Sequence, residues 1–198
     1  MKKILLDGRH LLYVLSFLIV VLLTAQFVAA ETTSTEKLQK ADELSKKSFE
    51  TAVEAKRAGD IDLARNALEL AVEATALLSE VVEEASVVTT EVLDKKKKEE
   101  YCSFAQIALD TSHNIIKAIA ETISAASYIA RTSTSPKTVI DARKIFTEAN
   151  KLIQKVEQIQ DKTVKILHVC GVTPVLPEPY QPTEEDLLLK ETEKASPV

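Results

Sequence analysis

Two cysteines and three histidines are the side chains with most potential for chemistry in this sequence of 198 residues. A pair of thiols can form a disulfide if the chain is exported to an oxidising compartment, whereas cysteine beside histidine is typical of a zinc site. Cys102 and Cys170 are the only cysteines, and they are far apart in the sequence. No Cys-x-x-Cys redox pair or haem-attachment sequence is present. The spacing therefore favours a structural disulfide.

The histidines do not follow a recognisable metal-binding pattern. A di-iron or di-manganese bundle requires Glu-x-x-His on two helices. Asp110 precedes His113 at this spacing, and Lys165 precedes His168. His168 and the two cysteines would also lack a clear fourth zinc ligand. We therefore expect no metal and no cofactor.

Catalytic motifs are also missing from the sequence. It has no Gly-x-Ser-x-Gly nucleophile elbow, and its three glycines are too few for a loop that cradles phosphate. No acid, base and nucleophile occur in a recognisable arrangement. We therefore predict that the protein is not an enzyme.

Charge and aromatic content exclude a further class of function. The chain has 25 basic and 30 acidic residues, with a net charge of −5, and it contains no tryptophan. An acidic chain is repelled by phosphate backbones, and base stacking requires aromatic platforms. We expect no nucleic-acid partner.

The N-terminus has the organisation of a signal peptide. Lys2, Lys3 and Arg9 precede an apolar run at 11–23, and small residues end the segment at Ala30. We predict cleavage after Ala30 and a secreted or periplasmic protein. The alternative is an uncleaved anchor, because residues 11–30 are just long enough to span a bilayer. The remainder would then be attached to a membrane, facing outside the cytoplasm.

Helix-breaking residues are scarce in the middle of the chain. Between Glu31 and Ser135 there is no proline, and the only glycine is Gly59. Apolar and small residues recur at intervals of three and four, which predicts amphipathic helices. The clearest series is Ala64, Ala67, Ala71, Ala74, Leu78, Val81, Ala85, Val88 and Val92. The sequence predicts an all-α protein, an antiparallel up-down four-helix bundle with coiled-coil-like packing over residues 31–170.

Residues with end-of-helix preferences predict where the helices begin and end. Thr33 and Glu36 form a possible capping box. Gly59 suits the end of the first helix, and Asp60 can cap the second. Ser135 as a cap and Pro136 at the first helical position suit the start of the fourth helix. We expect a turn at Lys95–Lys98 between the second and third helices. The alternative is one continuous helix. The third helix has apolar residues on several faces after Asp110, so we expect it to be covered on more than one side.

The expected turn near Thr134 lies almost midway between the two cysteines. With a rise of about 1.5 Å per residue, their heights along an antiparallel helix pair differ by roughly 6 Å. Both lie on the inward-facing series of their helices. A disulfide between Cys102 and Cys170 is therefore predicted to clamp one end of the bundle.

Residues 171–198 form a proline-rich, acidic tail. Its composition is typical of a disordered terminus, but Tyr180 and Leu187, Leu188 and Leu189 could anchor it on a partner or on the bundle itself. The apolar surface of the third helix, including Ile119 and Ile123, is a second candidate for partner contact.

These observations lead to two functional hypotheses. The first is an exported, non-catalytic helical bundle that acts through protein–protein contacts, in a structural or adaptor role, with an unknown partner or with a second copy. The alternative is a binding module for a small apolar ligand or a metal held between helices, beside the alanine-rich half of the second helix.

Overall fold

The computed structural model describes residues 34–91 and 95–175, with side chains omitted at 90–98. The chain divides into two compact units, Met1–Glu36 and Lys37–Val198, and the bundle belongs to the second. It contains α2 (Ile61–Glu91), α3 (Lys95–Thr132) and α4 (Pro136–Val169). They are preceded by a helix that ends at residue 58, and its part from Lys37 onward is called the N-terminal helix below. The predicted all-α four-helix bundle is confirmed.

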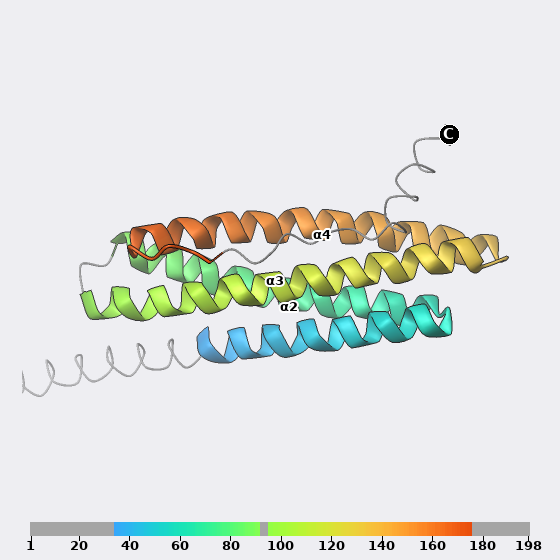
Figure 1. Cartoon of the computed structure of the whole chain (residues 1–198), viewed down its shortest axis with the longest axis horizontal. Coiled ribbons are helices and arrows are strands. Elements are labelled where there is room, and N and C mark those ends of the chain that lie inside the picture. Colours follow the sequence, from blue (N-terminus) through green and yellow to red (C-terminus); the bar gives the residue numbers. More distant parts are fainter. Residues whose placement is uncertain (1–33, 92–94, 176–198) are drawn as a thin grey trace, which may run out of the picture. The chain divides into compact units, whose positions relative to one another are not determined.

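The helices alternate in direction along the chain (Figure 1). Side-chain contacts establish this order. Lys37 of the N-terminal helix pairs with Glu84, near the far end of α2, while Ser48 bonds to Ala67, nearer its start. Contacts of this kind require antiparallel neighbours. On α3, by contrast, Asn114 bonds to Asp42 and Ser124 bonds to Lys56, so the N-terminal helix and α3 run parallel.

Residues with the predicted capping preferences form the turns. Gly59 has a φ of 65°, and the Asp60 amide donates to the Ala55 carbonyl at 3.1 Å, which closes the N-terminal helix. The Asp60 carboxylate then accepts from the Asp62 amide at 2.8 Å and caps α2.

The start of α4 also agrees with the sequence prediction. Ser135 is its N-cap, and its hydroxyl accepts from the Thr138 amide at 3.4 Å. Pro136 occupies the first helical position, where its missing N–H has no cost. A glycine with positive φ, Gly171, follows the last turn.

The predicted inward-facing series fill the core. On α2 all of its members from Ala64 to Ala85 are buried, and the first four alanines have no exposed surface. Leu78, Leu109, Ile115 and Val156 are among the largest fully buried side chains. Because alanine is short, the α2 backbone can approach its neighbours closely along its first half.

Helix α3 is buried on almost every face in its second half. Residues 118–120 and 122–127 are all buried, and most of them are alanine, serine or threonine. The helix packs against both α2 and α4 and bonds to the N-terminal helix. The expectation that α3 is covered on more than one side is confirmed.

The second and third helices are separate, as predicted, but the predicted position of the turn was wrong. Lys95–Lys98 begin α3 instead of forming the turn. Lysine has a high helix propensity, and the unfavourable interaction of an exposed lysine with a helix N-terminus costs only about 0.3–1 kcal/mol. Helix α2 ends at Glu91, and it packs against α3 as a separate helix, which excludes the continuous helix.

Several predictions fall outside the described residues. They concern the signal peptide or anchor at 1–30, the possible cap at Thr33, and Tyr180 and Leu187 to Leu189 in the tail.

Candidate docking groove between α2 and α4

The two cysteines lie together at one end of the α3–α4 pair. The Cα atoms of Cys102 and Cys170 are 5.9 Å apart, and their sulfur atoms are at disulfide distance. Beside them the Val172 amide donates to the Leu167 carbonyl, and the Gly171 amide donates to the His168 carbonyl, both at 3.0 Å. This pair of bonds ends α4 and fixes the position of Cys170. Both cysteines are half-buried.

The two histidines of the described residues lie on different helices. His113 is half-buried on α3, and His168 is exposed near the end of α4. Within the described ranges, no three histidine, cysteine or acidic side chains come close enough to hold a metal ion.

Ile119 and Ile123, named above as candidate partner contacts, are part of the protein's own core. Their exposed fractions are 0% and 6%, and they share one cluster with Ala71 and Ala74 of α2. Neither side chain therefore offers a surface to a partner in this structure. The same cluster occupies the space beside the α2 alanines, where the alternative hypothesis places a ligand.

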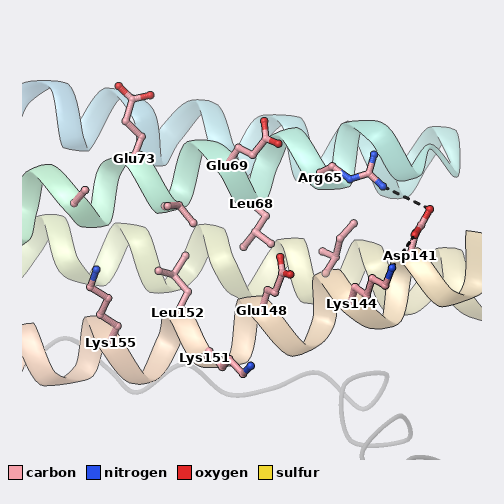
Figure 2. Close-up of a pocket in the computed structure, with 13 residues that line it drawn as sticks. Arg65, Leu68, Glu69, Glu73, Asp141, Lys144, Glu148, Lys151, Leu152 and Lys155 are labelled. Carbon is pink, nitrogen blue, oxygen red and sulfur yellow. Dashed lines mark ion pairs between the residues drawn. The ribbon is translucent and has the colours of Figure 1, made fainter.

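A different surface, between α2 and α4, combines a hollow with apolar and charged side chains (Figure 2). This α2/α4 groove has a volume of about 670 Å³. Its apolar floor consists of Leu68, Val72 and Ala76 from α2 and Ile145 and Leu152 from α4. Leu68 and Leu152 point into the space between the helices. On α2 the groove extends from Arg65 to Ala76, which corresponds to about 17 Å along the helix axis.

The floor is only partly covered. Leu68, Ile145 and Leu152 are buried, at 5%, 3% and 8% exposed, and they belong to the core. Val72 is 49% exposed, and Ala76 is also exposed. The groove is thus an extension of the core that reaches the surface between two parallel helices.

The two rims of the groove differ in charge. Glu69 and Glu73 stand on the α2 side, whereas Lys144, Lys151 and Lys155 stand on the α4 side. The α4 rim also contains two acids, Glu148 between its lysines and Asp141 at its end, and Arg65 is the one base among the α2 residues that line the groove. Glu148 and Lys155 point towards α2, while Lys151 points away from it (Figure 2).

Some of these charges already have partners. Glu73 accepts from Lys40 of the N-terminal helix at 2.7 Å. At one end of the groove, Arg65 reaches Asp141 across the two helices at 3.6 Å. Lys151 and Lys155, by contrast, make no ion pair with any residue of the described ranges. These exposed lysines can therefore pair with an incoming anionic segment without breaking an existing bridge.

Further along the same two helices, Lys162 of α4 pairs with Glu83 of α2. This contact lies beyond one end of the groove, and the Arg65–Asp141 pair joins the same two helices at the other end. The described ion pairs between α2 and other helices join it to the N-terminal helix and to α4.

The groove was missed because it depends on residues outside the inward-facing series. Val72 was the available signal, since it is an apolar residue flanked by Glu69 and Glu73 on an otherwise charged face. A single exposed valine is common on protein surfaces. Its significance appears only when α4 places Ile145 and Leu152 beside it.

The groove can bind through shape, apolar contact and charge. Its lining contains carboxylates and ammonium groups but no histidine, cysteine, serine or threonine. A bound segment would place apolar side chains on the floor and charged side chains towards the two rims. This is the pattern of an amphipathic helix or a short extended peptide in a groove.

No protein-family model, curated protein or solved structure matches this chain. In the described part of the chain, no helix is both long and apolar enough to cross a membrane.

Proposed function

We propose that this protein is an exported, non-catalytic helical bundle that acts through protein–protein contacts, and that the α2/α4 groove receives an amphipathic helix from a protein partner. The observation that supports this most directly is the exposed floor of the groove at Val72, between rims of opposite charge. Apolar contact would supply affinity, while the rims would fix the orientation of the partner.

The size of the groove fits one partner helix. Its length of about 17 Å corresponds to about three helical turns, enough for apolar side chains at positions i, i+3 or i+4, and i+7. The rims would prefer a helix with bases facing Glu69 and acids facing Lys151 and Lys155. A contact of this size buries a small area, which favours a reversible interaction over a permanent complex.

Site-specific photo-crosslinking tests the proposal in the natural exporting host. A photo-reactive amino acid replaces Val72 in the groove, and the matched control carries it at Val53. Val53 is similarly exposed, at 44%, but lies on the N-terminal helix. We expect one discrete cross-linked protein from position 72 and none from position 53.

A charge-reversed variant shows whether the captured protein depends on the rims. Lys151→Glu with Lys155→Glu should abolish the adduct at position 72. Equal capture from positions 72 and 53, or an adduct that persists after charge reversal, would overturn the proposal. N-terminal sequencing of the same material tests export, because cleavage after Ala30 predicts a mature chain that begins at Glu31.

A further inference from the structure

We propose that the C-terminal segment 183–194 docks in the α2/α4 groove of its own molecule and is the resting occupant that a partner must displace. The inference rests on the groove of the proposed function, but it does not require a partner to exist. Three observations support it: the reach of the tail, its charge and its leucines.

The tail is long enough to reach the groove. Leu152 lies about 28 Å from Gly171 along α4, and Ile145 lies about 39 Å away, at 1.5 Å per residue. The chain from Gly171 to Leu187 spans about 50 Å in an extended polyproline conformation, which its prolines favour. These prolines are Pro174, Pro177, Pro179 and Pro182. The leucines can therefore reach any part of the groove floor.

The direction of the chain also suits this path. Helix α4 ends at Val169, and the hydrogen bonds from the Gly171 and Val172 amides turn the backbone out of the helix. Residues that follow can return along the outer side of α4, antiparallel to it. The α4 rim, with its lysines, is the edge of the groove nearest to that path.

The charge of the tail complements this rim. Acidic residues dominate after Gly171: Glu178, Glu184, Glu185, Asp186, Glu191 and Glu193. Segment 184–186 provides three consecutive carboxylates directly before the leucines, and Lys144, Lys151 and Lys155 are exposed on α4. Lys190 and Lys194 supply the opposite charge for Glu69 and Glu73 on the α2 rim.

The leucines match the exposed part of the floor. Leu187, Leu188 and Leu189 form the only run of three apolar residues beyond Val175. Covering Val72 and Ala76 with leucine would remove apolar surface from water, which favours docking. Because the tail is tethered, its effective concentration at the groove is in the millimolar range, so even weak contacts can keep it docked.

A single-tryptophan reporter makes this docking measurable. The natural chain has no tryptophan, so Leu188→Trp introduces a unique fluorophore. The protein is isolated from an exporting host, and the emission and acrylamide quenching of the tryptophan are compared with those of a free peptide of the same tail sequence. Docking predicts a blue-shifted emission and at least a two-fold lower quenching constant than in the peptide.

Two groove variants and one control locate the docking site. Val72→Arg, and separately Lys151→Glu with Lys155→Glu, should return the tryptophan to the peptide value. Val53→Arg, at a comparably exposed site on the N-terminal helix, should leave it protected. Both groove variants change exposed positions, and circular dichroism verifies that the bundle remains folded.

The alternative results are distinct. Peptide-like quenching in the parent protein, or equal loss of protection with Val53→Arg, overturns the proposal. Protection that decreases on dilution assigns the tail to the groove of a second copy and overturns docking within one molecule. Photo-crosslinking at position 72 tests for a partner independently of the tail. A stop codon after Val175 removes the tail, and partner capture at position 72 should then increase if the tail competes for the groove.

Discussion

Ser48 of the N-terminal helix donates a hydrogen bond to the backbone carbonyl of Ala67 on α2, with an Oγ–O distance of 2.7 Å. Both residues are completely buried. The bond joins a side chain of one helix to the main chain of the next, which is possible only where the two backbones approach closely. The small residues Ala52 and Ala64 maintain this close approach towards the turn.

Replacing Ser48 tests the contribution of this contact to stability. Ser48→Ala removes the hydrogen bond without adding volume, so the free energy of unfolding should fall by about 1 kcal/mol. Ser48→Val also loses the bond and adds bulk between two close backbones, so a larger loss of about 2–3 kcal/mol is expected. Urea denaturation measures both. A valine variant as stable as the alanine variant would show that the helices are not tightly packed here.

Two serines on α3 should respond to alanine substitution with opposite signs. The Ser127 hydroxyl is buried and has no hydrogen-bond partner among the described residues. Ser124, one turn earlier, accepts from the Lys56 ammonium at 2.9 Å. Ser127→Ala should therefore stabilise the protein by about 1 kcal/mol, whereas Ser124→Ala should destabilise it slightly. Thermal or chemical denaturation distinguishes them, and a loss of stability in Ser127→Ala would contradict the assignment.

The turn before α2 depends on the backbone conformation of Gly59. Its φ of 65° is unfavourable for residues with a Cβ, although no other atom lies within 4 Å of where that Cβ would be. Gly59→Ala should thus reduce stability by about 1 kcal/mol through backbone strain alone. Gly59→Asn is the control, because asparagine tolerates this conformation better and should cost less. Equal losses in the two variants would point to a cause other than φ.

Asp42 should make stability depend on pH in the acidic range. Burial raises its pKa, but hydrogen bonds from Lys46, at 2.6 Å, and from Asn114, at 2.9 Å, outweigh this effect and hold the pKa below its usual value. A carboxylate with a lowered pKa stabilises the folded state above its unfolded pKa of about 3.9. That stabilisation is lost as the pH falls through the folded value.

Asp42→Asn provides the measurement for this group. The variant should be less stable than the parent at pH 7, and the difference should disappear as the pH is lowered towards 2. Urea denaturation across this range follows the difference. A difference in stability between variant and parent that stays constant with pH would mean that ionisation of Asp42 does not contribute to stability.

The cysteine pair should act as a structural clamp. Thiol labelling of the non-reduced protein should find no free cysteine, and closing a loop of this length contributes on the order of 4 kcal/mol in the chain-entropy model. The Cys102→Ser, Cys170→Ser double variant should accordingly unfold at a lower urea concentration while keeping its helices. Two reactive thiols in the exported protein would contradict the clamp and make a metal site worth testing again.

Local preferences were sufficient to predict most of the helical framework. Helical periodicity identified the inward-facing residues of α2. Helix ends were marked by Gly59, Asp60, Ser135 and Pro136, because the role of each depends on a few neighbouring atoms. Similar chain lengths on both sides of Thr134 predicted that Cys102 and Cys170 lie at nearly the same height. The error at Lys95–Lys98 arose because a weak charge preference was given more weight than helix propensity.

Only the tertiary structure decided which surfaces are available for contact. Periodicity marks Ile119 and Ile123 as apolar but does not show how many neighbours surround α3, and in the bundle they are buried. Val72 is an ordinary exposed valine until α4 lies parallel to α2 and places Ile145 and Leu152 beside it. The sequence determined the helices and their ends through short-range interactions. Their relative positions, and with them the groove, follow from close packing between residues far apart in the chain.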